Sequence, residues 1–151
     1  MKEMIRRPGG ICVSVPSEIP NGTLFISVNA SWGENIICRS TGKRVSLENC
    51  TRAFWRERNL VTANYRRCEW AAALLRGEIV GFWRIDKNSW KRCNSITDLA
   101  ECERDGVPDP ERLYCGFLQD DEDVKSLRQK LVGKRVRIGR SFSPVNACFN
   151  S

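Results

Sequence analysis

Tryptophan and arginine recur side by side along this chain, in a pattern suited to binding a phosphorylated aromatic ligand. The 151 residues include five tryptophans and 18 arginines, against seven lysines. An indole ring offers a flat face on which a base can stack, and a guanidinium group grips phosphate through parallel hydrogen bonds. We therefore predict a surface for nucleotides or nucleic acid. Its candidate residues are Asn29, Trp32, Arg52, Trp55, Arg56, Arg84, Trp90, Arg92, Arg135 and Arg137.

The first group of candidates surrounds a predicted helix. Asn29 and Trp32 follow the end of a predicted strand, while Arg52 and Arg56 are four residues apart and so share one helical face. Trp55 lies one position from that face. A base stacked on a tryptophan would leave the arginines to hold its phosphate. The alternative is that the tryptophans pack in the core and the arginines are solvated.

The other two groups lie on predicted strands. Arg84 ends the second strand of an apolar hairpin, and Trp90 and Arg92 follow a polar turn. In the segment KRVRIGR, alternation places Arg135 and Arg137 on one face, where they could contact successive phosphates. An edge strand protected from aggregation by its charges explains that segment equally well.

One enzyme-like pattern is present. Pro108-Asp109 followed by Asp123 and Lys125 matches the spelling of a PD-(D/E)xK nuclease, in which two carboxylates hold a divalent metal beside a lysine. Acids crowd this region, so the match is weak. Asp123 also falls in the first turn of a predicted helix, where a carboxylate favours the helix dipole.

The charge of the chain is unevenly distributed. The net charge is +7, but ten of the 18 acids lie between Asp98 and Asp123 with only two bases. That segment therefore carries −8, and the rest of the chain +15. A basic body with an acidic strip could attract a polyanion to one face. A solvated acidic loop that binds nothing is the simpler explanation.

The absence of histidine excludes several chemistries. Without it there is no Ser–His or Cys–His nucleophile pair, no histidine-based nuclease and no zinc deaminase signature. The eight cysteines include no CxxC pair, so zinc is not expected. Their even number and three glycosylation-type sequons suit a secreted disulfide framework. Their positions inside apolar runs favour buried thiols in a reducing cytoplasm.

Apolar periodicity predicts the elements that position these side chains. The clearest is a hairpin with strands over 69–75 and 79–85 and Arg76-Gly77 at its tip, where glycine supplies a positive φ. The other expected elements are strands at 11–15, 23–30, 112–118 and 134–138, a helix at 47–57, and a helix from Asp120 or Asp121 to Leu131.

Strands joined by hairpins and long loops favour an α+β fold. We predict a small, mostly antiparallel curved sheet or barrel of five to six strands with two or three helices. Residues 1–10 are expected to form a disordered basic lead, and residues 11–151 a single domain. No apolar run approaches the roughly 20 residues that cross a bilayer, and no signal peptide is visible. A cytoplasmic protein is therefore expected.

Several motifs resemble those of known protein groups. The order VNxxW, TRxFWR, RGEIVG and WRID, extending to Pro144-Val145, is similar to a group of small uncharacterised microbial or phage proteins. The hairpin LLRGEIVGFWRI also resembles the barrel hairpin of PUA-like domains of the ASCH and EVE type. That second resemblance implies a barrel that binds RNA or modified bases. It covers about 20 residues and carries over no pocket residue.

Three functions remain open at this point. The leading prediction is a non-catalytic module that binds nucleic acid or a nucleotide, without a cofactor and without a membrane partner. The second is a phage-type protein that sequesters a nucleotide signal or inhibits a host factor, for which a homo-oligomer would be expected. The third is a metal-dependent nuclease that uses Asp109, Asp123 and Lys125.

Overall fold

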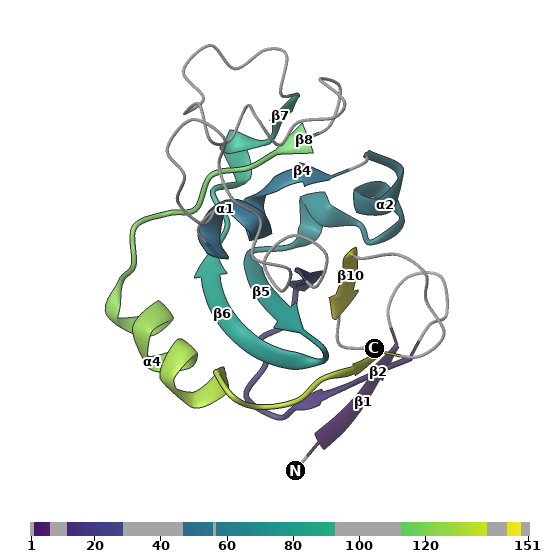
Figure 1. The fold of residues 1–151 in the computed structure, drawn as a ribbon, viewed down its shortest axis with the longest axis vertical. Helices are drawn as coiled ribbons and strands as arrows, with labels where there is room; N and C mark the ends of the chain where they lie inside the picture. The colour runs from purple at the N-terminus through teal and green to yellow at the C-terminus, as the bar shows by residue number, and fades with distance from the viewer. Residues whose placement is uncertain are drawn as a thin grey trace.

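The computed structural model of the protein describes residues 2–6, 12–28, 47–55, 57–92, 113–138 and 145–148, which form three small sheets and several helices (Figure 1). The α+β class with mostly antiparallel strands is confirmed, and within the described ranges the strands close no barrel. The strands are β1 (Lys2–Arg6), β2 (Cys12–Pro16), β3 (Thr23–Ser27), β4 (Ala53–Trp55), β5 (Trp70–Leu75), β6 (Glu78–Arg84), β7 (Lys91–Arg92), β8 (Leu113–Tyr114), β9 (Arg137–Ile138) and β10 (Val145–Cys148). The helices are α1 (Leu47–Arg52), α2 (Glu57–Thr62) and α4 (Glu122–Leu131), with 3₁₀ turns η1 (Tyr65–Arg67) and η2 (Lys87–Ser89).

The central sheet has the order β10-β3-β5-β6 and is buried on both faces. β3 pairs in parallel with β5, whereas its partner β10 is antiparallel. Leu24, Ile26 and Val28 belong to the apolar cluster on one face, and Phe25 to the cluster on the other. Successive residues of the strand expected over 23–30 thus face opposite sides of the sheet. Two separate apolar layers therefore rest on one short sheet.

The predicted hairpin of β5 and β6 is present, and it determines the shape of the sheet. Leu75 pairs with Glu78, which leaves a two-residue turn of Arg76 and Gly77. Their φ angles of 50° and 82° are both positive, as a type I′ turn requires. A Cβ on Gly77 would lie 3.2 Å from the carbonyl oxygen of Val136, so glycine also permits a close backbone approach.

The helix α4 covers β6 at the edge of the central sheet (Figure 1). Its N-cap is Asp121, whose carboxylate accepts a hydrogen bond of 2.9 Å from the backbone N–H of Val124. Val124 and Leu131 are fully buried and Leu127 is partly buried, so these three residues form the inward face of the helix that the sequence predicts. The helix ends before Gly133, where φ is +95°.

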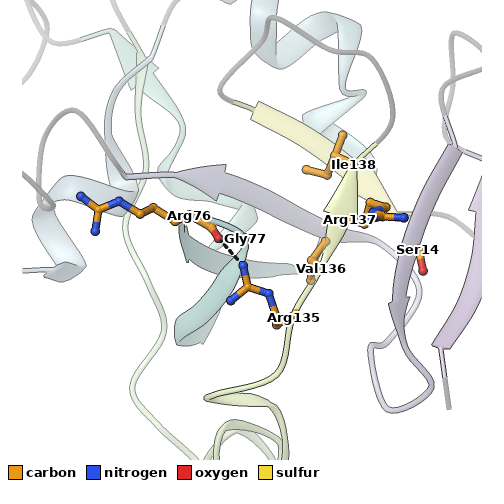
Figure 2. A pocket seen from close by; sticks show the side chains of 7 residues that line it. All are labelled: Ser14, Arg76, Gly77, Arg135, Val136, Arg137 and Ile138. Atoms are coloured by element: carbon orange, nitrogen blue, oxygen red, sulfur yellow. Dashed lines mark hydrogen bonds between the residues drawn. The ribbon is translucent and has the colours of Figure 1, made fainter.

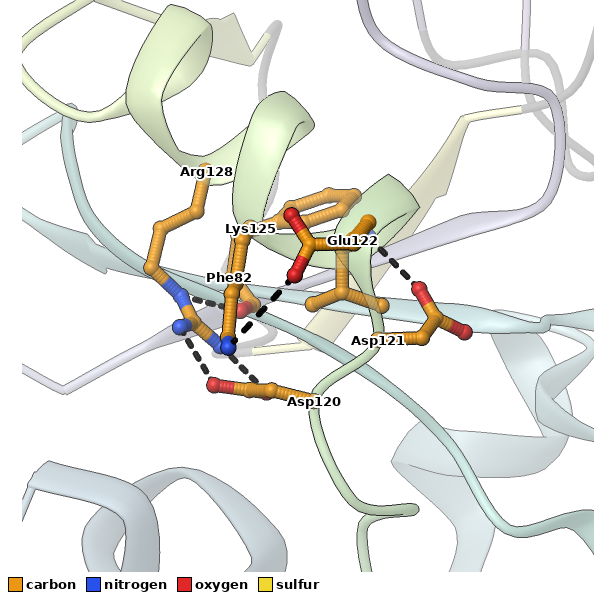
Figure 3. A network of polar contacts seen from close by, with 7 residues as sticks. Phe82, Asp120, Asp121, Glu122, Lys125 and Arg128 are labelled. Atoms are coloured by element: carbon orange, nitrogen blue, oxygen red, sulfur yellow. Dashed lines mark hydrogen bonds and ion pairs between the residues drawn. The ribbon is translucent and has the colours of Figure 1, made fainter.

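Arg128 fastens α4 to the sheet (Figure 3). Its Nε donates to the carbonyl of Phe82 at 2.9 Å, and its two Nη atoms donate to both carboxylate oxygens of Asp120 at 2.6 and 2.8 Å. The hydrogen bonds from Arg128 hold the pKa of Asp120 below its usual value. The bidentate geometry orients both partners, as is typical of an arginine–carboxylate pair.

Two smaller sheets flank the central one, and each differs from an expectation drawn from the sequence. In the sheet β1-β2-β9, residues 2–6 form β1 and pair with β2, where a disordered lead was expected. The backbone of residues 2–6 pairs with that of β2 along all five residues, which gives this segment a regular strand conformation. In the sheet β4-β8-β7, Ala53 pairs with Tyr114, so the helix predicted over 47–57 ends at Arg52. Strand pairing with β8 overrides the local helical pattern there.

The segment from Gly133 to Val136 joins the hairpin to β9. The N–H of Gly133 donates to the carbonyl of Ile79, and the N–H of Ile79 donates to the carbonyl of Lys134, each at 2.9 Å. The N–H of Val136 donates to the carbonyl of Gly77 at 2.7 Å. The ammonium of Lys134 lies 2.5 Å from the carboxylate of Glu18. The hairpin and the sheet β1-β2-β9 are thereby held together.

We expect Arg128→Met to lower the free energy of unfolding by about 1–3 kcal/mol, because it removes hydrogen bonds to a charged group and leaves the Phe82 carbonyl without its donor. Chemical denaturation checks this value. Lys125→Met is the control on the same helix, since Lys125 makes only an exposed ion pair of 3.9 Å with Glu122. Equal losses in the two variants would contradict a specific role for Arg128.

We expect the thermal stabilisation from Glu18 to disappear in acid. The hydrogen bond from Lys134 lowers the pKa of Glu18 below its ordinary value of 4.5. Because the folded-state pKa is lowered, the stabilisation is fully present above the ordinary pKa of 4.5 and is lost as the pH falls from there through the folded-state pKa. The Tm of the wild-type protein should therefore exceed that of Glu18→Gln at neutral pH.

The measurement is a series of thermal melts of both proteins from neutral pH to well below pH 4.5. Other carboxyl groups titrate alike in the two proteins, so the difference in Tm isolates Glu18. That difference should narrow only at the acid end. A difference that stays constant down to the lowest pH would show that the charge of Glu18 contributes nothing.

Candidate anion-binding site

A pocket of about 640 Å³ opens where the tip of the central hairpin meets β2 and β9 (Figure 2). It is lined by Arg76 on the turn, by Arg135 and Arg137 on the segment that follows α4, and by Ser14 on β2. Its size falls within the range of about 300–1,000 Å³ that is typical of ligand pockets. The site therefore combines enough space for a small ligand with an arginine-rich wall.

The two arginines predicted from the KRVRIGR segment both lie in this pocket. Arg135 and Arg137 are exposed, whereas Val136 between them is buried and Ile138 packs against the apolar core. The alternation expected from the sequence is thus present. It anchors the segment through its apolar side chains and leaves both guanidinium groups at the surface.

Arg135 is oriented by the turn of the hairpin. Its Nη2 donates a hydrogen bond of 2.8 Å to the backbone carbonyl of Arg76. In Figure 2 its guanidinium group points at the turn, while the side chain of Arg76 itself extends away from Arg137. One donor of Arg135 is occupied by this contact, and its other N–H groups stay available to a ligand.

Arg137 stands beside a hydroxyl group. It pairs directly with Ser14 across β2 and β9, so the two side chains share one face of the sheet (Figure 2). A serine hydroxyl can donate one hydrogen bond, and a guanidinium group can donate several. This cross-strand pair offers an anion two kinds of donor at one place.

None of the described residues that line the pocket is acidic. Within the described ranges, neither Arg135 nor Arg137 forms an ion pair. Of the carboxylates in this part of the fold, Glu78 lies opposite Arg135 in an isolated β-bridge without a described ion pair, and Glu18 is paired with Lys134. The positive charge of the two arginines is therefore not compensated by a described carboxylate within ion-pair distance.

Arg84, another predicted site residue, makes its contacts within the fold. Its guanidinium carbon lies 4.5 Å from the ring centroid of Trp70, and its Nη2 lies 3.3 Å from the carboxylate of Asp121. Trp70 in turn stacks on Phe82 at 5.5 Å. The cation–π partner of Arg84 is therefore Trp70, which lies opposite it on β5, so the contact comes from strand pairing and not from adjacency in the sequence.

Trp90 is half-buried against the core. Its ring meets that of Tyr65 edge to face at 4.7 Å, and its Nε1 is buried without a hydrogen-bond partner in the described part of the chain. Trp83 stacks on Phe117 at 5.1 Å. Neither ring lines the arginine pocket, so the structure does not unite these tryptophans with Arg135 and Arg137.

The remaining predicted ligand-binding residues are only partly described. Asn29, Trp32 and Arg56 lie outside the described residues. Arg52 ends α1, Trp55 ends β4 and Arg92 lies in β7. The predicted placement of Arg52 and Arg56 on one helical face is wrong, because the chain leaves α1 at Arg52 and enters β4.

The residues predicted for a nuclease are likewise divided. Asp109 lies outside the described residues, while Asp123 and Lys125 are exposed in the first turns of α4. Lys125 approaches Glu122 at 3.9 Å. Among the residues with a described position, no group of three histidine, cysteine or acidic side chains could hold a metal ion.

The sequence prediction missed two residues of the pocket. Ser14 alternates with apolar residues in β2, and its register opposite Arg137 depends on strands far apart in the chain. Arg76 was predicted only as part of a turn. The signal for Arg76 was available, since a type I′ turn prefers asparagine, aspartate or glycine where this chain has arginine.

Comparison with known proteins does not assign the chain to a family. No protein-family model, curated protein or solved structure matches the chain. The resemblances to the microbial and phage group and to PUA-like domains therefore stay predictions. Across the described ranges, no helix has the length and apolar character needed to cross a membrane.

Proposed function

We propose that this protein is a non-catalytic module that binds the phosphate groups of a nucleic acid or nucleotide. The observation that carries the proposal is the pocket of about 640 Å³, which has arginines in its wall and no acid among its described lining residues. Arg135 and Arg137 are the principal cations, and Ser14 is a further donor. These assignments come from the chemistry of the side chains and from their position together.

Arginine suits this role because its planar group matches two phosphate oxygens at once. Arg135 is held by the carbonyl of Arg76, so little side-chain entropy is lost when it receives an anion. Arg137 approaches from β9 beside the hydroxyl of Ser14. Val136 and Ile138 form the apolar support behind them, which lowers the local dielectric constant and strengthens the attraction.

The sequence predicted a ligand bound by tryptophan and arginine together, whereas the proposed site binds it through arginine. Trp83 and Trp90, as described, pack against other aromatic rings. Phosphate contacts position a nucleic acid but carry no base information, so binding through Arg135 and Arg137 should depend on salt far more than on sequence.

We place the protein in a reducing cytoplasm. Cys68 and Cys115 are both buried, and the thiol of Cys68 donates a long hydrogen bond of 3.8 Å to the carbonyl of Asn64. Buried thiols of this kind behave as small apolar groups. A phosphate ligand of nucleic-acid type is available in that compartment.

We expect the protein to bind a short fluorescent oligonucleotide, and Arg137→Gln or Arg135→Gln to weaken that binding about tenfold each at low salt, because each removes a charge-assisted hydrogen bond. Fluorescence anisotropy titration measures the affinity. Two neutralised phosphates alone predict that raising the salt from about 50 to 200 mM weakens binding to a single strand at least about sevenfold.

The control is Arg66→Gln. Arg66 is exposed on η1, before β5, whereas the pocket lies at the turn that follows β5. The Arg66→Gln substitution removes the same charge as the other two variants, but away from the pocket. It should therefore leave the affinity nearly unchanged. Binding that is indifferent to salt, or an equal loss in all three variants, would contradict the proposal.

A further inference from the structure

We infer that Glu78 is a charge filter for the anion-binding pocket, a fixed carboxylate that makes the site favour a phosphodiester over a terminal phosphate. The inference rests on the proposed function and deepens it, because it names the class of phosphate that the arginines receive. Glu78 begins β6 directly after Gly77, a turn residue that lines the pocket.

Backbone pairing places Glu78 beside one of the two principal arginines. Glu78 lies directly opposite Arg135 in an antiparallel bridge between β6 and the segment that follows α4. The residues on either side make the two flanking backbone hydrogen bonds, at 2.9 and 2.7 Å. Glu78 and Arg135 are therefore a non-hydrogen-bonded pair, in which the Cα atoms are only about 4.5 Å apart and the side chains are close. The carboxylate of Glu78 thus belongs to the immediate surroundings of Arg135.

Glu78 also shares a face with both arginines. The neighbouring residues Ile79 and Val136 belong to one apolar cluster. Because successive side chains of a strand point to opposite faces, Glu78, Arg135 and Arg137 point away from that cluster. All three are exposed. An anion that reaches the two arginines therefore approaches on the side that carries Glu78.

The charge of Glu78 is not neutralised by its neighbour. Among the ion pairs of the described residues, none includes Glu78. Arg135 instead donates its Nη2 hydrogen bond of 2.8 Å to the carbonyl of Arg76. A carboxylate therefore stands beside the place where Arg135 would receive an anion, and it repels that anion.

This repulsion grows with the charge of the ligand. A phosphodiester carries one negative charge, whereas a phosphomonoester carries about 1.5 to 2 at neutral pH. At low salt, a unit charge about 7 Å away changes the affinity roughly three- to tenfold for each charge on the ligand. Arg135 and Arg137 attract both forms, but Glu78 repels the monoester more strongly. The carboxylate therefore shifts the selectivity of the site toward a diester linkage.

The test is Glu78→Gln, which removes the charge and keeps the shape of the side chain. The ligands are a nucleoside 5′-monophosphate and its methyl ester, which differ only in carrying a monoester or a diester phosphate. Each competes at low salt with the fluorescent oligonucleotide, whose own affinity is measured for each variant. Glu78→Gln should bind the methyl ester about three- to tenfold more tightly than the wild type does. The ratio of the two affinities should shift toward the monophosphate about two- to tenfold.

The control is Glu122→Gln, which removes the same charge from the first turn of α4. Nearly the whole length of that helix separates Glu122 from the segment that lines the pocket, so this variant should keep the wild-type ratio. A thermal melt checks that Glu78→Gln is folded, as expected for an exposed side chain.

Equal gains for the two ligands, no gain for either, or the same shift in Glu122→Gln would overturn the inference. If Arg135→Gln or Arg137→Gln still weakened binding of the oligonucleotide in those cases, the proposed function would stand. Failure of the oligonucleotide and of both small ligands to bind the wild-type protein would overturn both.

Discussion

The close backbone approach between the hairpin turn and the segment after α4 is the constraint on which the pocket depends. The backbone N–H of Val136 donates to the carbonyl of Gly77 at 2.7 Å. A Cβ atom on Gly77 would lie 3.2 Å from the carbonyl oxygen of Val136. Only a residue that lacks a side chain and accepts a positive φ fits there. This contact brings the segment up to the turn itself, where the carbonyl of Arg76 orients Arg135.

The arginines of this fold fall into two groups that differ in their partners. Arg128 and Arg84 face Asp120 and Asp121, which begin or precede α4, and both lie near indole rings. Their charges are satisfied by carboxylates, and they join the helix to the sheet. Arg135 and Arg137 have no such described partner. The acidic segment therefore divides the arginines into structural and ligand-facing sets, which composition alone cannot distinguish.

Local patterns predicted much of the architecture. The hairpin, the helix from Asp121 to Leu131, and the alternation around Val136 are each determined by neighbouring residues, and each is present. The end of α1 at Arg52 was not predictable in this way. Its cause is the pairing of β4 with β8, whose residues come much later in the chain.

The site was predictable to a similar degree. Alternation alone placed Arg135 and Arg137 at the surface, because that property is local to the strand. The association of Ser14 with Arg137 arises from the register of β2 and β9, which no short pattern reveals. The tertiary roles of Arg84 and Trp90 were hidden for the same reason, since their partners Asp121 and Tyr65 lie outside the motifs that contain them.

The antiparallel pairing of β10 with β3 has a consequence for how the protein is made. Residues 145–148 complete one side of the central sheet, although β3 is synthesised more than 100 residues before them. Until synthesis reaches that point, one edge of an apolar strand has no covering neighbour, and such an edge is a template for association with other chains. In the folded protein, β10 covers that edge of β3.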